Sequence, residues 1–351
     1  MKSLIPSFLS QLQFSTDELA TIQRLGQARG RQDLFTQQAS EQLKSLRQVA
    51  LVESSESSNR IEGITVEEGR IEALVQRGSA PRDRSEQEVA GYRDALQLVH
   101  ESAEHMAFSV NVILQLHSLI YRYLPEDGGR FKPTDNEIVE RDETGQIVRV
   151  RFKAVPAVAT PGAMQDLETT YREATRGSGR APLEPLVAVP LAVLDFLCIH
   201  PFRDGNGRVA RLVTLLLIYH FDYQVGRYVS LERIIEESKE TYYEALEASS
   251  RGWHEGQHDV HPWLNYLWGV LIRAYGEFEE RMEAAIRTGG NKTAQIRAAV
   301  NRRTSPFAIS ELESELAGIS RDMVRHVLRQ MRVEGVVEVV GQGRGAKWRK
   351  Q

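Results

Sequence analysis

The strongest constraint on the fold is a twelve-residue polar string that lies between two apolar stretches. Residues 200–211 read HPFRDGNGRVAR, and residues 186–199 and 209–219 are apolar nearly all round. Helices of that kind are buried at the centre of a bundle. Pro190 is expected in the first turn of its helix, where proline is tolerated. A loop held between two core helices keeps its binding groups preorganised.

The residue types in this string suit an anionic ligand. Gly205 and Gly207 let backbone N–H groups turn inward to form a concave anion site. A helix that starts near Asn206 adds its positive dipole end. Arg208 and Arg211, three residues apart, emerge on one face of that helix, where both can fork onto phosphate oxygens.

The same string offers a metal ligand and a base. Asp204 supplies a hard oxygen ligand that suits Mg²⁺ shared with phosphates. His200 can accept a proton near pH 7, because its unperturbed pKa is about 6.5. The string therefore predicts a site for a metal-bound polyphosphate, although a glycine loop that merely joins two core helices is the alternative.

The string resembles the signature of Fic domains, H-P-F-x-(D/E)-G-N-G-R-x-x-R, and agrees with it at every fixed position. The resemblance implies a mainly α fold, a Fic-type helical bundle with a small β-hairpin flap. It also implies a protein adenylyltransferase that uses ATP and Mg²⁺. Asp204 would hold the metal ion. His200 would take a proton from a Ser, Thr or Tyr hydroxyl of a target protein, or of this chain itself. The phosphates would lie on Gly205, Asn206, Gly207, Arg208 and Arg211.

A second motif lies in residues 54–63, SSESSNRIEG, where Ser58, Glu62 and Gly63 fit Ser/Thr-x-x-x-Glu-(Gly/Asn). On a helix, Ser58 and Glu62 share a face one turn apart, and Gly63 is a natural terminator. The motif resembles the inhibitory helix of Fic proteins, in the version N-terminal to the catalytic core. That resemblance implies that Glu62 pairs with Arg211 and withholds it from the γ-phosphate. A solvated helix end is the alternative.

Residues 137–152 predict a β-hairpin around the turn 142–145, because Val148, Val150 and Phe152 follow the turn at period two. In Fic domains a hairpin at this point is a flap that holds the target segment as an added strand. An unpaired strand edge suits that purpose, since main-chain bonds position a side chain without reading its sequence. A short structural hairpin is the alternative.

Other candidate residues divide between ligand contact and packing. By the resemblance, Tyr242 or Tyr243 could contact adenine, and core packing is the equal alternative. His117 is expected in the core or at its boundary. Cys198 is the single cysteine and is expected to be buried and inert. The three histidines His254, His258 and His261 are expected in a solvated loop. Their irregular spacing does not favour a metal cluster.

Charge is distributed unevenly along the chain. Residues 291–351 hold 12 Lys and Arg against 6 Asp and Glu, a net charge of +6. The whole chain has a net charge of −4, so the remainder carries −10. A basic tail on an acidic body indicates two different partners.

The tail also has its own pattern of helix signals. Ser310 with Glu313 predicts a capping box for a short helix, and Ser320 can cap a second helix that runs through residue 333. On that helix, arginines recur every four residues, and two strands are expected around a glycine-rich tip at 341–345. The pattern resembles a winged helix-turn-helix, in which Arg321, Arg325 and Arg329 would meet DNA phosphates. Protein contact or dimerisation is the equal alternative.

We expect three regions: helices with the inhibitory motif in 1–105, the catalytic core in 106–288 and the winged helix-turn-helix in 291–351. Ser15 and Glu18 predict a helix start in the first region. A cytoplasmic protein without membrane contact is expected, because the chain shows no basic segment followed by a long apolar run. Three functional alternatives remain: a DNA-binding regulator whose body senses nucleotide, an enzyme that removes AMP, and use of GTP or CTP. A homodimer is left open.

Overall fold

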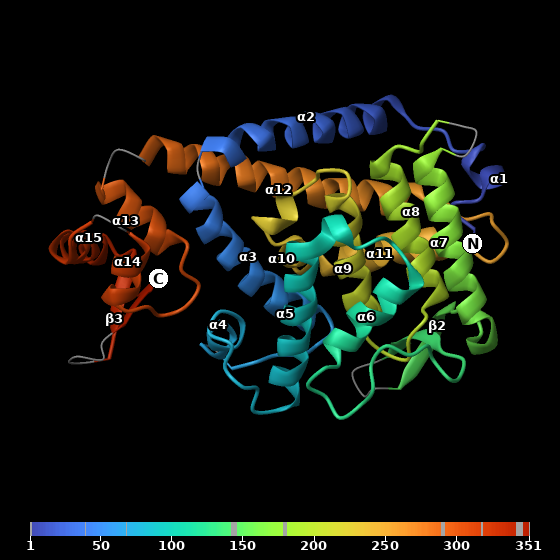
Figure 1. Cartoon of the computed structure of the whole chain (residues 1–351), viewed down its shortest axis with the longest axis horizontal. Helices are drawn as coiled ribbons and strands as arrows, with labels where there is room; N and C mark the ends of the chain where they lie inside the picture. Colours follow the sequence, from blue (N-terminus) through green and yellow to red (C-terminus); the bar gives the residue numbers. More distant parts are fainter. Residues whose placement is uncertain are drawn as a thin grey trace.

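The protein is a helical body with a smaller C-terminal unit at one end (Figure 1). The structure is a computed structural model that describes residues 2–38, 40–67, 69–141, 146–177, 181–288, 292–316, 319–341 and 347–350. The body contains α1 (Pro6–Leu9), α2 (Thr16–Gln38), α3 (Ser40–Ile61), α4 (Arg70–Val75), α5 (Arg84–Ser102), η1 (Ala103–His105), α6 (Val110–Ile120), η2 (Ala157–Ala159), α7 (Thr160–Arg176), α8 (Pro185–Ile199), α9 (Asn206–Tyr219), η3 (Val225–Arg227), α10 (Leu231–Glu237), α11 (Lys239–Ser250) and α12 (His261–Thr288).

The two apolar stretches form α8 and α9 at the centre of the body, as the sequence predicts. Every residue of α8 after Pro185 is buried, and α9 is buried along nearly its whole length. The two helices pack against one another, and α5, α6, α7 and α12 surround them. The loop that joins α8 to α9 is thus fixed at both ends by the core.

Pro190 corrects one expectation. The helix α8 begins with Pro185, so Pro190 lies in its sixth position and not in its first turn. A proline there has no N–H to donate to the carbonyl of Leu186. The indole of Trp268 on α12 donates to that carbonyl instead, at 2.7 Å. A side chain far along the chain therefore satisfies the backbone that Pro190 leaves open.

Most buried apolar side chains of the first 105 residues, among them Leu25, Tyr92 and Leu96, belong to the same cluster as Phe196 of α8 and Phe278 of α12. A small separate cluster joins α3, α4 and α5: Val52, Ile71, Leu74, Val75 and Val89. The N-terminal helices therefore pack as part of the body. The predicted boundary at 105 stays a prediction.

Helix starts in the body follow the predicted capping. Ser15 and Glu18 bond reciprocally before α2: the Ser15 N–H donates to the Glu18 carboxylate at 2.8 Å, and the Glu18 N–H donates to Ser15 Oγ at 3.2 Å. This capping box is confirmed.

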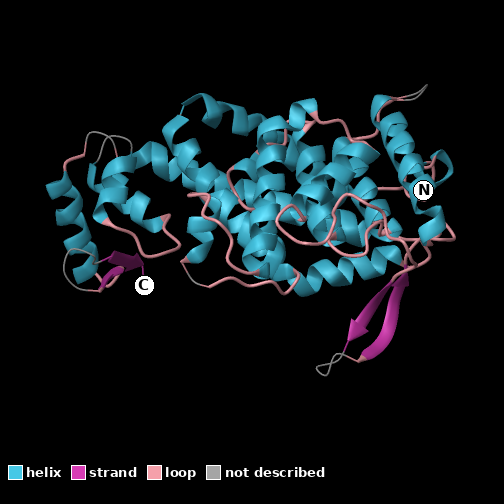
Figure 2. Ribbon diagram, turned by 60° about the horizontal axis from the view of Figure 1, so that its bottom comes forward, coloured by secondary structure: helices cyan, strands magenta, loops and turns pink. Residues whose placement is uncertain are grey.

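The body also contains the predicted hairpin, which projects from the helices (Figure 2). Strands β1 (Glu137–Arg141) and β2 (Ile147–Lys153) pair antiparallel, with register shifts after Ile138 and Glu140. The turn 142–145 lies outside the described residues.

The C-terminal unit, residues 292–350, has a separate hydrophobic cluster. It contains α13 (Lys292–Asn301), α14 (Ile309–Glu315), α15 (Arg321–Val333), β3 (Val337–Val340) and β4 (Lys347–Lys350). The helix α15 has Ser320 as its N-cap, as predicted. In α14 the expected cap is wrong, because the helix begins at Ile309 and Ser310 lies inside its first turn. Most of the tip at 341–345 lies outside the described residues, as do Gly318, where a turn is expected before Ser320, and residues 178–180, where a flexible connection is expected.

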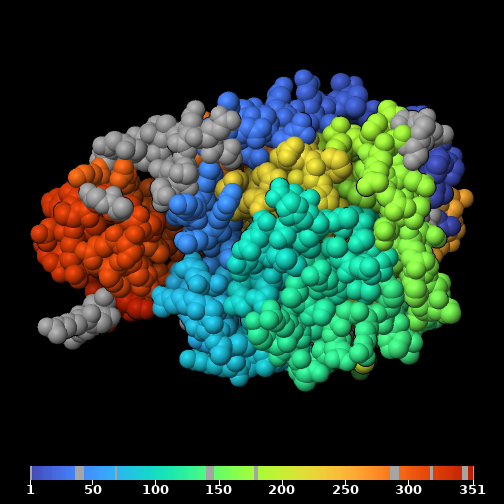
Figure 3. All heavy atoms as spheres, viewed as in Figure 1, coloured from blue at the N-terminus to red at the C-terminus, as the bar shows by residue number. Residues whose placement is uncertain are grey.

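The C-terminal unit rests against the body at α3 and α4, which lie beside it in the space-filling view (Figure 3). Ser45 of α3 donates to Glu315 at 3.3 Å, and Arg77 lies 3.8 Å from Glu311. In the described part of the chain, no helix combines the length and the apolar character needed to cross a lipid bilayer.

Candidate active site

The loop between α8 and α9 turns at two residues with left-handed backbone. His200 ends α8 with φ of 52°, and Gly205 precedes α9 with φ of 81°. Such a φ is uncommon outside glycine, so His200 is held there by its surroundings. The side chain of Asn206 closes the loop, since its amide donates to the Phe202 carbonyl and its Oδ1 accepts from the Phe202 N–H, both at 2.9 Å. Both ends of this amide therefore shape the loop.

A second segment clamps the loop from outside. Lys132 Nζ donates to the carbonyls of Ile199 and His200, at 3.2 and 2.9 Å, and Asn136 Nδ2 donates to the carbonyl of Phe202 at 3.0 Å. Lys132 is only 4% exposed, and burial lowers its pKa to about 8. These donors satisfy the carbonyl groups left open where α8 ends.

His200 is oriented as a base. Its Nδ1 lies 3.3 Å from the carbonyl of Leu197, and because a carbonyl only accepts, Nδ1 carries the hydrogen. The lone pair is then on Nε2. Burial lowers the pKa of His200 to about 4, so the ring is neutral at pH 7. A neutral imidazole with a free Nε2 can take a proton from a hydroxyl group.

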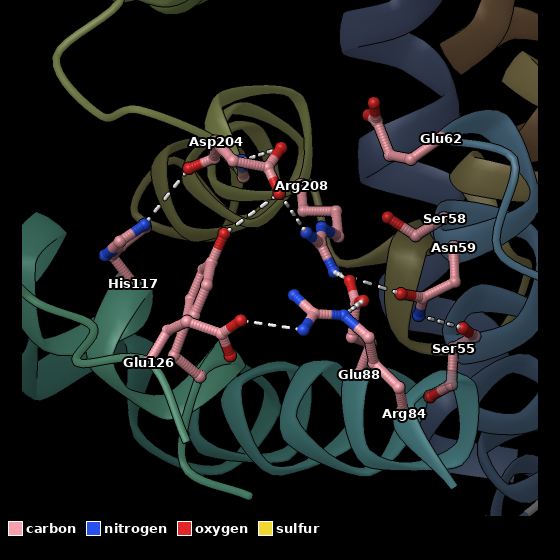
Figure 4. A network of polar contacts seen from close by, with 12 residues as sticks. Ser55, Ser58, Asn59, Glu62, Arg84, Glu88, His117, Glu126, Asp204 and Arg208 are labelled. Atoms are coloured by element: carbon pink, nitrogen blue, oxygen red, sulfur yellow. Dashed lines mark hydrogen bonds and ion pairs between the residues drawn. The ribbon is translucent and has the colours of Figure 1, made fainter. Parts of the chain in front are cut away.

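Asp204 is exposed but firmly held (Figure 4). Its Oδ1 accepts from the Gly205 N–H at 2.7 Å, and its Oδ2 accepts from the Tyr121 hydroxyl at 3.0 Å. His117 accepts the Gly129 N–H on Nδ1, so its Nε2–H donates to the Asp204 carbonyl at 3.1 Å. The carboxylate is 72% exposed at the mouth of the loop.

Arg208 lies in the core. Its side chain is 1% exposed, and its Nη1 donates to Glu88 of α5 at 2.6 Å. The Asn59 amide oxygen and the Asp204 carboxylate lie farther from the guanidinium, at 3.4 and 3.5 Å (Figure 4). Arg208 therefore ties the loop helix to α5 and α3.

Arg211 binds the end of α3. Its Nε donates to Ser58 Oγ, and its Nη2 donates to the Ser58 carbonyl and to Glu62 Oε1, each at 2.8 Å. Burial by itself would lower the pKa of Arg211, but the charge of Glu62 holds it above its ordinary value. The helix α3 ends at Ile61, and Gly63 follows with φ of 82°. The contact implied by the second motif is present.

Glu62 fills a hollow beside Gly207. A Cβ placed on Gly207 would clash with Glu62 Oε1 and would lie 3.2 Å from Arg211 Nη1. That Nη1 is buried without a hydrogen-bond partner among the described residues. The hollow thus holds an anionic oxygen between a glycine and an arginine, which is the environment that a phosphate oxygen needs.

The donor set at the loop fits Mg²⁺ shared with a substrate. Within the described ranges, no three His, Cys, Asp or Glu side chains lie together so that they could hold a metal ion. Asp204 offers one exposed carboxylate, and Mg²⁺ is commonly bound by one or two carboxylates plus substrate phosphates. Asp204 would hold the ion, and the remaining ligands would come from the substrate and water.

The family comparison matches this part of the chain. Residues 107–218, which include the hairpin, α8, the loop and α9, match the model described as the Fic/DOC family. Residues 107–218 form a Fic domain. The fold agrees: a Fic family protein from Desulfovibrio desulfuricans superposes with a TM-score of 0.61 at 22% identity, over 97% of both chains. Fic-1 from Caenorhabditis elegans, residues 134–508, gives 0.57 at 20% identity, over 78% of this chain and 74% of that one.

Two curated relatives carry the name protein adenylyltransferase. The first, from C. elegans, is 25% identical over 214 residues, covering 59% of this chain and 37% of that protein. The other, from Nematostella vectensis, is 24% identical over 221 residues, covering 60% of this chain and 44% of that protein. The matched part of this chain therefore spans less than half the length of these relatives.

The two tyrosines expected near adenine lie on α11, where the charges of Arg211 and Glu62 act on both. Tyr242 is 4% exposed and packs against the rings of Tyr243, Trp263 and Tyr266. Burial raises the pKa of Tyr242 above its ordinary value, and the charge of Arg211 partly offsets this. Tyr243 is partly exposed, and after burial the charge of Glu62 is the next cause that raises its pKa. Both rings border the site, and contact with adenine stays a prediction.

Three side chains that position the loop between α8 and α9 were not predicted as such from the sequence: His117, Lys132 and Glu88. The expectation that His117 is a core histidine is confirmed, and the stacking of its ring on Phe202, with centroids 3.8 Å apart, explains its place. The only signal was the neighbouring Gly128-Gly129, whose backbone passes close to the helix α6. Lys132 and Glu88 gave no signal, because nothing in the sequence distinguishes a buried charge from a solvated one.

The loop around residues 252–261 corrects another expectation. His258 is not solvated: it is 5% exposed, stacks on Phe8 and lies 2.8 Å from Ser3 Oγ. His261 pairs with Glu18 at 2.7 Å. The N-terminal segment thus covers His258, whereas His254 is exposed, as expected.

Proposed function

We propose that this chain is a protein adenylyltransferase that moves AMP from ATP to a hydroxyl group of a target protein. The observation that carries the proposal is the pairing of a neutral His200, with Nε2 free, and a concave anion site in one rigid loop. Position and charge neutralisation account for most catalysis of this kind of transfer.

In the proposed reaction, His200 Nε2 takes the proton of a Ser, Thr or Tyr hydroxyl. The oxygen then forms a bond to the α-phosphorus of ATP, while the bond to the bridging oxygen of pyrophosphate breaks. AMP stays on the target and pyrophosphate leaves. The N–H groups at the start of α9, beside Gly207, would bind the phosphates, because the Gly205 N–H already donates to Asp204. Asp204 would hold a magnesium ion, which would neutralise charge on the leaving pyrophosphate.

We assign the restraint of this activity to Glu62. Its carboxylate occupies the hollow beside Gly207 and uses Arg211 Nη2, so a phosphate oxygen has to displace it. The competition for Arg211 resembles an inhibitory helix, supplied here by the end of α3. A coupling of about 1–3 kcal/mol corresponds to roughly 5- to 150-fold repression.

The hairpin offers a place for the target. Its strand β2 exposes Ile147 and Val148, at 56% and 62%, and salt bridges from Arg149 and Arg151 to Glu247 join it to α11. A strand edge held in this way can receive an extended segment by main-chain bonds. The target would then be selected by an exposed segment that carries a hydroxyl group.

A body that only sensed nucleotide would need no base in the loop, so the orientation of His200 favours the enzyme over the sensor.

Incubation with ATP and Mg²⁺ followed by intact-mass measurement tests the proposal. The Glu62→Gly variant should acquire AMP or transfer it to a protein in a lysate, and adding His200→Ala should abolish this. Unchanged masses for the Glu62→Gly variant and all lysate proteins would overturn it. Parallel incubations with GTP and CTP identify the nucleotide, and loss of AMP from a modified target would reveal the reverse reaction.

A further inference from the structure

The C-terminal unit has an arginine face that the proposed function does not use. At 3.6 residues per turn, four side chains of α15 fall within roughly 80° of its circumference: Arg321, Arg325, Arg329 and Arg332. All four are exposed. The adjoining face packs into the core of the unit through Val324, Val327, Leu328 and Met331, each at most 1% exposed.

Acidic neighbours do not neutralise this face. Each of the six Asp and Glu side chains of residues 291–351 lies within 4.0 Å of an arginine, in the pairs Glu311–Arg77, Glu313–Arg321, Glu315–Arg302, Asp322–Arg325, Glu334–Arg297 and Glu338–Arg349. On α15 the contacts to Arg321 and Arg325 are long, at 3.5 and 3.8 Å, and exposed pairs of that kind are weak. Among the described residues, Arg329 and Arg332 have no ion pair.

The position of α15 leaves the face accessible. The helix packs on α13, α14 and β3, and the unit meets the body through Glu311 and Glu315 of α14. Figure 1 places α15 at the end of the molecule farthest from the Fic domain. The strand β4 adds exposed basic residues, Lys347 and Lys350, on the hairpin next to β3.

We infer that α15 and this hairpin bind double-stranded DNA. A helix of 13 residues is about 20 Å long and fits the major groove, which is about 12 Å wide. An arginine guanidinium can donate two parallel hydrogen bonds to phosphate oxygens. The arginines of α15 lie along one side of the helix, so several of them can contact the phosphates that line a groove. The acidic body repels DNA, so the contact is confined to the unit. The inference is independent of the transfer reaction.

The test is fluorescence anisotropy with the full chain and a labelled duplex DNA of mixed sequence at several salt concentrations. The expected result is binding that weakens with salt, because each phosphate contact contributes about 0.9 to the slope of log K against log salt. Replacing Arg321, Arg325 and Arg329 by Ala should lower that slope by roughly 2 to 3 and weaken binding at least tenfold at low salt.

In the matched control, Arg24, Arg172 and Arg176 of the body are each replaced by Ala. These three arginines are exposed and have no ion pair in the described part of the chain. It changes the net charge equally and should leave binding within twofold. The single variant Arg329→Gln guards against misfolding and should lower the slope by about 1. Absence of binding, equal loss in both triple variants, or tighter binding of duplex RNA than of duplex DNA would overturn the inference.

Discussion

Two ion pairs on the same helix are built differently. Arg208 and Arg211 lie one turn apart on α9, and each faces a glutamate from the N-terminal half of the chain. The Glu88 side chain is 10% exposed and projects from the second turn of α5, whereas the Glu62 side chain is 29% exposed and lies just past the end of α3. The Glu88 carboxylate is enclosed by packed helices, whereas the Glu62 carboxylate lies after a helix end and can move away from Arg211.

This difference assigns different roles to two arginines that look alike in the sequence. The Arg208–Glu88 pair cannot open without leaving a charge in the core, which is costly. When Glu62 leaves, Arg211 keeps two hydrogen bonds to Ser58, and its place beside Gly207 is free for another anion. The burial of the partner thus decides which pair is structural and which can act as a switch.

The largest effect is expected from breaking the structural pair. Glu88→Gln leaves the buried Arg208 charge with only the exposed Asp204 carboxylate, 3.5 Å away, as a counter-charge. We expect a loss of about 3–5 kcal/mol in the free energy of unfolding. Glu62→Gln should cost about 1 kcal/mol, because Arg211 keeps its bonds to Ser58. Urea unfolding of both variants measures the difference, and equal losses would remove the distinction between the pairs.

The next effect concerns the hollow that Glu62 fills. Gly207→Ala expels the Glu62 carboxylate but puts a methyl group in its place, so it should not activate transfer. In the Glu62→Ala background the same methyl group should lower the rate of AMP transfer roughly 100-fold, since small displacements at a reacting centre have effects of that size. Initial rates of the double variant and of Glu62→Ala test this. Equal rates would show that phosphate does not use the hollow.

The smallest effect is expected from pH. Both arginines stay charged, so the titrating group in the loop is His200, which is active as a base only when neutral. Its pKa of about 4 keeps it neutral as pH falls through 6.5, and protonation removes activity only near pH 4. The kcat/KM should therefore be flat between pH 6 and 7.5, where a histidine with an ordinary pKa would give about a fourfold change. A limb centred near 6.5 would contradict the environment described for His200.

The sequence predicted those parts of the site that depend on local pattern. The polar string between two apolar stretches placed the loop at the centre of the bundle, and periodicity predicted the hairpin. The contact between Glu62 and Arg211, 149 residues apart, came from a motif resemblance, because no local pattern indicates it.

The supporting contacts could not be predicted, because each joins residues far apart in the chain. Glu88 and Arg208 are 120 residues apart in the sequence, and Lys132 and His200 are 68 apart. Trp268 is 82 residues from Leu186, whose carbonyl accepts its hydrogen bond. Their side chains carry no local mark of burial, since a buried charged group is recognised only by its partner.

If Glu62 restrains transfer by holding Arg211, removing it should raise the transfer rate, and removing a nearby glutamate that does not contact Arg211 should not. Glu56→Ala is the matched control, since Glu56 lies on α3 shortly before Glu62, is 32% exposed and pairs with Arg60 at 2.7 Å. Initial rates of AMP transfer are measured for the wild type, Glu62→Ala and Glu56→Ala. We expect a rise of roughly 5- to 150-fold for Glu62→Ala and a change of less than about twofold for Glu56→Ala. A wild-type rate in Glu62→Ala, or an equal rise in both variants, would contradict this role of Glu62.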